Sequence, residues 1–233
     1  MSIASEISRL QTAKADIKSA IESKGVTVPS SATIDTYDDY VSQISGGGGD
    51  VPSNLSEWTY DDNGNILSMT YTAETIPASA YSYSKLESAT ISNSVTTIED
   101  SAFDYCTSLT SITIPSGVTS IGQRTFNNCR SFTSVTIPDS VISIGYRAFY
   151  NCFSLSACTI GNGVISISGQ AFFNCSSLSS ITVNAATPPE LENANAFNNT
   201  NDCPIYVPAE SLEAYKSATN WSTYASRIQA IPT

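Results

Sequence analysis

An α/β repeat solenoid is the fold class that this sequence predicts, and two regularities predict it. A Phe is followed three residues later by a Cys in four segments spaced 23 residues apart: Phe103 with Cys106, Phe126 with Cys129, Phe149 with Cys152, and Phe172 with Cys175. A further apolar residue follows each Cys after three residues, at Leu109, Phe132, Leu155 and Leu178. Units of equal length that each bury one apolar side must stack to share a core.

The first part of each rung predicts a short strand, because apolar and polar residues alternate. The two inward columns are Ala89, Ile112, Val135, Cys158 and Ile181, and then Ile91, Ile114, Ile137, Ile160 and Val183. Threonine stands between them in every rung, at Thr90, Thr113, Thr136, Thr159 and Thr182. A β-branched hydroxyl residue suits the solvent side of a sheet, so we expect an exposed threonine column.

The second part of each rung predicts another inward segment and a closing turn. Val and Ile recur three residues apart, at Val95 with Ile98, Val118 with Ile121, Val141 with Ile144, and Val164 with Ile167. The Phe-x-x-Cys element that follows is expected to form one helical turn, because residues i and i+3 share a helix face. A period of 23 residues is typical of a right-handed leucine-rich-repeat solenoid, which we predict over residues 76–200.

Residues 1–45 predict a small helical segment for attachment or oligomerisation. Apolar residues spaced alternately four and three apart form a heptad seam that one lysine interrupts: Ile3, Ile7, Leu10, Lys14, Ile17 and Ile21. A second helix is expected from Ile34 to Ile44. The first helix either packs on its neighbour or self-associates, and Ile at both core positions favours a homotrimer. Four consecutive glycines then predict a linker at residues 46–50.

Both ends of the solenoid are expected to carry caps, because an uncapped end exposes core and sheet edge. Residues 51–75 predict a β-hairpin at the N-terminal end, with two strands joined through Asp62-Asn63-Gly64. Residues 201–233 predict the C-terminal cap, with a final strand at 203–207 and one amphipathic helix from Glu210 to Ile228.

Composition and charge exclude several classes of function. The net charge of -11 repels nucleic acid and anionic membranes, and the ten Lys and Arg residues form no cluster in the sequence. There is no apolar stretch long enough to cross a membrane, so no membrane insertion is expected. The first residues lack a basic segment followed by an apolar run, so we expect no secretory signal and synthesis in the cytoplasm. Because the chain has no His, the sequence predicts no enzyme, cofactor or metal site.

The six cysteines are predicted to be free, buried thiols. Four of them occupy one repeat position, so their side chains stack in parallel about 4.8 Å apart, an orientation that disfavours disulfide bonds. Cys158 replaces the Ile or Val of other rungs, which indicates that cysteine serves as a small apolar residue. The absence of Cys-x-x-Cys pairs argues against a metal site.

The positions that flank each Phe are the candidate recognition surface. The frame is constant while these positions change in size and charge, so we expect them to face outward. Several carry Tyr, Arg or Phe, which are enriched in binding surfaces, although drift on an exposed face is the alternative explanation. The candidate ligand-binding residues are Tyr105, Gln123, Arg124, Asn127, Arg130, Tyr146, Arg147, Tyr150, Phe153, Gln170 and Phe173.

The pattern Phe-x-x-Cys-x-x-Leu-x-x-Ile-Thr-Ile-Pro-x-x-Val-x-x-Ile-Gly, seen in residues 103–122, closely resembles BspA-type leucine-rich repeats. The likeness extends over residues 76–230 and includes Cys203-Pro204-Ile205-Tyr206-Val207-Pro208. Members of that family are surface adhesins and interaction modules without catalytic residues. The resemblance therefore implies a non-catalytic adhesion or recognition protein whose repeat surface binds a bacterial receptor or glycan.

The N-terminal block, with Ile34-Asp35-Thr36-Tyr37 before the glycine tract, resembles the leading segment of tail and fibre proteins from phages of gut bacteria. This likeness implies a virion protein made in the host cytoplasm, attached to other virion proteins or to itself through residues 1–45. The alternative is a bacterial surface or secreted adhesin of the BspA type, located at the cell surface.

Overall fold

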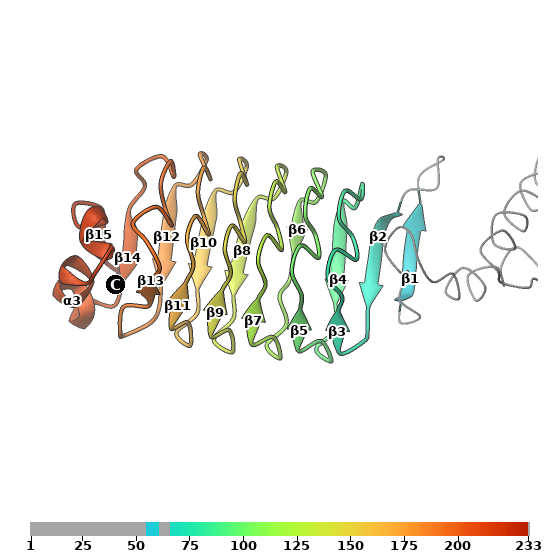
Figure 1. Cartoon of the computed structure of the whole chain (residues 1–233), viewed down its shortest axis with the longest axis horizontal. Helices are drawn as coiled ribbons and strands as arrows, with labels where there is room; N and C mark the ends of the chain where they lie inside the picture. The colour runs from blue at the N-terminus through green and yellow to red at the C-terminus, as the bar shows by residue number, and fades with distance from the viewer. Residues whose placement is uncertain (1–54, 61–65, 233) are drawn as a thin grey trace, which may run out of the picture. The chain divides into compact units, whose positions relative to one another are not determined.

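The structure is a computed structural model that describes residues 55–60 and 66–232. The helices expected in residues 1–45, the linker at 46–50 and the hairpin turn at 62–64 lie outside the described residues. In the described part, short strands stack in two columns, and each coil of the chain supplies a strand to both (Figure 1). The repeat solenoid predicted from the 23-residue period is therefore confirmed.

The first column of strands follows from the alternation of apolar and hydroxyl residues. Its strands are β2 (Ile66–Tyr71), β4 (Ser88–Ile91), β6 (Ser111–Ile112), β8 (Ser134–Ile137), β10 (Ala157–Ile160), β12 (Ser180–Val183), β14 (Ile205–Val207) and β15 (Ile228–Ala230). Parallel pairing keeps the repeat register, so Thr159 lies between Thr136 and Thr182. The threonines at 90, 113 and 136 are exposed, as expected. Hydrogen bonding divides this column into two sheets: β2-β4-β6, which β1 (Leu55–Tyr60) joins at its edge, and β15-β14-β12-β10-β8.

The second column is a continuous six-stranded parallel sheet. Its strands are β3 (Thr75–Ile76), β5 (Thr97–Ile98), β7 (Ser120–Ile121), β9 (Ser143–Ile144), β11 (Ser166–Ile167) and β13 (Glu190–Leu191). In each strand the second residue is buried and the first lies toward solvent. The apolar residues of both columns therefore enclose one core.

A β-hairpin covers the N-terminal end of the solenoid. Strand β1 (Leu55–Tyr60) pairs antiparallel with β2, and β2 pairs parallel with β4. The hydroxyl groups of Thr59 and Ser68 lie 2.8 Å apart across the hairpin. The hairpin therefore supplies the first strand of the solenoid and turns the sheet edge into an antiparallel ribbon, which agrees with the two strands expected here.

The repeated Phe residues form a continuous stack of aromatic rings along the core. Phe149 lies between Phe126 and Phe172, with ring centroids 5.2 and 5.0 Å away. Tyr81 extends this stack at the N-terminal end, and the indole of Trp221 covers Phe197 at the other. The Phe side chains of the stack are completely buried. Stacked rings of this kind contribute beyond the area they bury.

The Phe-x-x-Cys element is not the helical turn expected from its spacing. Residues in this segment form consecutive tight turns, and their N–H groups point alternately within the coil and toward the next coil. The N–H of Asp104 donates to the carbonyl of Ser101 at 3.0 Å, whereas the N–H of Phe103 donates to Thr125 at 2.9 Å. In a helix all N–H groups point along the helix axis, whereas in these turns every second N–H bonds to the next coil, so stacking of coils favours the turns. The inward orientation of both Phe and Cys is nevertheless confirmed.

The cysteines are free and buried, as predicted. The thiol of Cys129 donates to the carbonyl of Phe103 at 3.2 Å, and Cys106, Cys152 and Cys175 donate in the same way to the core aromatic residue of the preceding coil. Burial raises the pKa of Cys106 to about 11, despite opposing hydrogen bonds from Ser84. The Cys106 thiol therefore stays protonated at neutral pH, and the buried cysteines act as apolar fillers with one weak donor.

The prediction of a single helix from Glu210 to Ile228 is wrong. The chain instead forms a short helix α3 (Leu212–Ser217) between 3-10 turns at 209–211 and 221–224, followed by strand β15. Asn220 adopts a left-handed backbone (φ 65), which redirects the chain after α3. This bend lets the Trp221 indole donate to the Pro189 carbonyl at 2.7 Å and lets β15 pair with β14. Within the described residues, the helices are too short to cross a bilayer.

Candidate functional site

The residues that flank each buried Phe form one outward surface, which we call the turn face. The structure places the predicted binding residues in three classes of exposure. Gln123, Arg124 and Arg130 are exposed, and Asn127 is buried. The half-buried residues are Tyr105, Tyr146, Arg147, Tyr150, Phe153, Gln170 and Phe173. The turn face is therefore a mixed surface whose aromatic residues are partly packed against their neighbours.

Five of the predicted residues meet in one group, which we call the Tyr-Arg cluster: Tyr146, Arg147, Tyr150, Gln170 and Phe173. The guanidinium of Arg147 lies over the Tyr146 ring at 4.9 Å and the Tyr150 ring at 4.7 Å. Its Nε donates to Oε1 of Gln170 at 2.7 Å, and the Tyr146 hydroxyl donates to the same oxygen at 3.1 Å. Tyr150 also stacks on Phe173 in the next coil, at 5.3 Å. The cluster thus holds a cation rigidly among aromatic rings.

Smaller aromatic contacts lie on either side of the cluster. Arg130 lies over the Phe153 ring at 5.6 Å. Nearer the N-terminus, Tyr105 stacks on Tyr83 at 4.8 Å. Tyr83 is 71% exposed and was not among the predicted residues, because its own rung departs from the Phe-x-x-Cys pattern. The signal that could have located Tyr83 is its position two residues after the core residue Tyr81, which matches Tyr105 after Phe103.

In the coils around Tyr81, Phe103, Phe126, Phe149 and Phe172, two positions adopt the left-handed backbone conformation, two residues before and two residues after this core aromatic residue. After it, the later coils use asparagine, which tolerates this conformation: Asn128, Asn151 and Asn174. Before it stand longer side chains, at Arg124 (φ 53), Arg147 (φ 57) and Gln170 (φ 58). Such residues cost roughly 1–2 kcal/mol in this conformation. Ser79 and Ser101 adopt the same conformation at this repeat position, so the turn of the repeat imposes it on side chains of different size and charge.

Asn127 does not belong to the outward surface, which corrects the expectation for this residue. It is 7% exposed, and its Nδ2 donates to Oδ1 of Asp104 at 2.7 Å. Asn128 in the same coil donates to Asn127, and the next two coils continue the chain of bonds, from Asn151 to Asn128 and from Asn174 to Asn151. The side chain is therefore used to join coils. Sequence reasoning missed this amide ladder, although asparagine recurs there at the 23-residue period.

The ladder ends on a carboxylate that is almost buried. Asp104 is 9% exposed, and this burial raises the pKa of its carboxyl above the ordinary value. The amide of Asn127 and the charge of Arg124 oppose the shift. Each amide donates toward the N-terminus, so the ladder is polarised in one direction, and such chains of hydrogen bonds strengthen one another.

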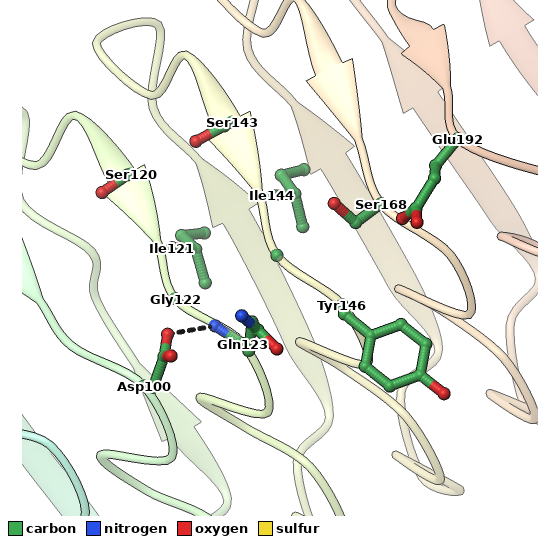
Figure 2. A pocket seen from close by; sticks show the side chains of 11 residues that line it. Asp100, Ser120, Ile121, Gly122, Gln123, Ser143, Ile144, Tyr146, Ser168 and Glu192 are labelled. Atoms are coloured by element: carbon green, nitrogen blue, oxygen red, sulfur yellow. Dashed lines mark hydrogen bonds between the residues drawn. The ribbon is translucent and has the colours of Figure 1, made fainter.

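A groove of about 530 Å³ runs beside the turn face, over the ends of strands β7 and β9. Figure 2 shows Tyr146 at its edge, with Asp100 and Gln123 at one end and Ser168 and Glu192 at the other. Ser120 and Ser143 also line it. Tyr146 and Gln123 thus belong both to the groove and to the turn face, so the two surfaces are continuous.

The carboxylates of the groove are fixed by backbone hydrogen bonds. Oδ1 of Asp100 accepts from the N–H of Gln123 at 2.7 Å, as the dashed line in Figure 2 marks. Oε2 of Glu192 accepts from the N–H of Gly169 at 2.7 Å. Both acids therefore serve to join coils. In the described part of the chain, no group of three or more Cys, Asp and Glu side chains is arranged to hold a metal ion.

Comparisons with known proteins agree with this architecture. Residues 74–215 match the family described as "BspA type Leucine rich repeat region", in six copies. The chain therefore belongs to the BspA-type leucine-rich repeat family. The match begins at residue 74, so it does not cover residues 1–45, for which a likeness to phage fibre proteins is expected. No curated protein sequence matches this chain.

Two solved structures share the fold. A leucine-rich repeat protein of T. pallidum is 22% identical, with a TM-score of 0.50, over 67% of this chain and 80% of that one. The pneumococcal vaccine antigen PcpA is 18% identical, with a TM-score of 0.55, over 73% of this chain. This chain spans 41% of the PcpA structure. At these identities the likeness concerns the fold alone.

Proposed function

We propose that this chain is a non-catalytic recognition protein that presents the Tyr-Arg cluster to a receptor or glycan on a bacterial surface. The observation that carries the proposal is the position of Arg147, which two tyrosine rings and one glutamine hold on a strained, outward-facing turn. Tyr and Arg dominate binding energy in protein interfaces, and a side chain held in place before binding loses little entropy.

The repeated frame supports the same function. The ring stack, thiols and inward strands are shared by successive coils, whereas the turn face differs from coil to coil. At the position of Arg147, other coils carry Ser101, Arg124 and Gln170 in the same left-handed conformation. The scaffold therefore tolerates different side chains at these positions, which is what a recognition surface requires.

Replacing Tyr146, Arg147 and Tyr150 together by serine is expected to weaken ligand binding at least about 30-fold, the effect of losing one binding hot spot. The measurement is binding of the full chain to an array of bacterial surface glycans, with thermal melting as a check on folding. Ser101 shows that serine is accepted at the position of Arg147.

The matched control is the triple variant in which Thr90, Thr113 and Thr136 become serine. These threonines are exposed on the first strand column, and they are not among the residues of the turn face. This control is expected to keep full binding. Binding that survives in the cluster variant, or that is lost equally in the threonine variant, contradicts the proposed site.

We also propose that residues 1–45 attach the chain to a phage tail or fibre. They do so by forming a homotrimer or by binding another virion protein. The heptad spacing and the likeness of this segment to phage fibre proteins support a virion component. The BspA-type repeat supports the alternative, a bacterial surface or secreted adhesin. Tail or capsid genes beside this gene would favour the virion.

Light scattering tests the trimer. The full chain is expected to have the mass of three chains, and Leu10→Asp with Ile17→Asp, which places charges in the heptad seam, is expected to give a monomer. Exchange of Lys14 for Glu serves as the control, because this position of the seam is already charged. A monomeric wild-type chain contradicts oligomerisation through residues 1–45.

A further inference from the structure

We infer that the ligand of the Tyr-Arg cluster is a sparsely charged glycan, recognised through a carboxylate group that Arg147 binds. This inference rests on the proposed function and names the chemical class of its ligand. It is argued from the free donors of Arg147, from the other arginines on the turn face and from the charge of the whole chain.

Arg147 is fixed in place but keeps donors for a ligand. In the structure the guanidinium lies over the rings of Tyr146 and Tyr150, and its Nε donates to Gln170. The terminal amino groups have no hydrogen-bond partner among the described residues. A guanidinium edge of this kind matches the two oxygens of a planar carboxylate.

The fold also brings together basic residues that are separate in the sequence. Arg124 occupies the same repeat position as Arg147 in the preceding coil, and its backbone N–H donates to the Tyr146 carbonyl at 2.9 Å. Arg130 lies on the same face, over Phe153. Neighbouring coils are about 4.8 Å apart, so the backbone positions of Arg124 and Arg147 are one coil spacing apart. The charge of Arg124 also acts on Asp104 in the preceding coil. Basic residues that are separate in the sequence thus occupy one face of the solenoid.

The aromatic residues and the net charge narrow the class of anion. The Tyr150 ring is already covered by the Arg147 guanidinium and by Phe173, so the half-buried rings of Tyr146 and Phe173 are the apolar surfaces beside the guanidinium that the C–H groups of a sugar ring can contact. The chain as a whole carries a charge of -11, and Asp100 and Glu192 line the adjoining groove. A densely charged polyanion is repelled by this field, whereas an oligosaccharide with a single carboxylate carries little charge and still provides an anionic partner for Arg147.

The test compares binding of the full chain to immobilised sialyllactose and to lactose, which differ by one carboxylate-bearing sugar. The wild-type chain is expected to bind sialyllactose at least tenfold more tightly and to lose this preference as the salt concentration rises. Arg147→Gln is expected to remove the preference, and Arg147→Lys is expected not to restore it, because a lysine lacks the planar pair of donors. Gln170 shows that glutamine is tolerated at this backbone position.

Lys216→Gln is the matched control, since it removes the same charge from α3 in the C-terminal cap, where Lys216 faces Glu213 at 3.6 Å. It is expected to bind as the wild type does. Equal affinity for the two sugars, an equal effect of the two variants, or tighter Arg147-dependent binding of heparin or a DNA oligonucleotide overturns the inference. If the Tyr146, Arg147 and Tyr150 variant loses binding to neutral glycans while Arg147→Gln keeps it, the recognition face stands and the carboxylate is excluded.

Discussion

Replacing Phe149 by alanine is expected to lower the free energy of unfolding by about 3–5 kcal/mol, because it removes a fully buried ring and leaves a cavity. The ring lies in the middle of the aromatic stack, between Phe126 and Phe172. Coils on both sides therefore lose a contact, and neither can move inward without breaking its strand pairing. Urea unfolding followed by circular dichroism measures the loss as a lower midpoint.

Phe153→Ala is the matched control, because it deletes the same side chain four residues later on the turn face. Phe153 is half-buried and contacts Arg130. Its loss is expected to cost less than about 1 kcal/mol, the range of an exposed cation–π contact. If the two variants unfold at the same urea concentration, the ring stack is not the main source of stability in this part of the solenoid.

Gly163→Ala is expected to destabilise the chain by about 3 kcal/mol, at the upper end of the cost of an overpacked site. A Cβ atom at this position would lie 1.9 Å from the backbone carbonyl oxygen of Asp139 in the preceding coil. That oxygen belongs to a turn which is also held by the bond from the N–H of Asn162 to the Asp139 carboxylate, at 2.8 Å. The coils must separate locally to admit the methyl group, and a drop in the melting temperature measures the cost.

The same repeat position two coils earlier provides the control. At Gly117 the nearest atom to an added Cβ is the carbonyl oxygen of Val95, at 3.0 Å. Gly117→Ala is expected to stay within about 1 kcal/mol of the wild type, because the lower entropy of the unfolded chain offsets the tight contact. Similar losses in both variants would show that the close approach of Gly163 to its neighbour does not limit stability.

The sequence was sufficient to predict the core, because each core position is repeated and therefore stands out against the variable ones. The buried Phe, Cys, Ile and Val columns were all identified in this way. The turns that carry Phe103 and its equivalents were mistaken for a helix, since both structures bury residues i and i+3. The difference lies in where the backbone N–H groups point, and side-chain periodicity contains no information on that.

The C-terminal cap shows a second limit of sequence patterns. Apolar spacing from Leu212 to Ile228 fits a helix, but the indole of Trp221 and the pairing of β15 with β14 require the chain to bend at Asn220. These are contacts with distant residues, and they outweigh a local preference for helix. No repeat exists at the end of the chain to reveal the exception.

The candidate site was predicted in its composition but not in its arrangement. Residues flanking each Phe were expected to face outward, and most of them do. Pairing between coils decides which of them meet: Arg147 contacts Gln170 because they are one period apart, and Asn127 is drawn inward by Asp104. Such contacts depend on the direction of each side chain on a left-handed turn, which the spacing alone does not give.

The polarised amide ladder has a consequence for how the protein can change in length. Asn128 and Asn151 each accept a bond from the following coil and donate one toward the N-terminus, so a coil with this asparagine fits between two similar coils. A duplicated 23-residue segment would extend the ladder, the ring stack and both strand columns by one member and leave the caps unchanged. Coil number therefore sets the reach of the exposed surface, by about 4.8 Å for each added segment. Gain or loss of whole coils offers a route by which descendants of this gene match ligands of different lengths.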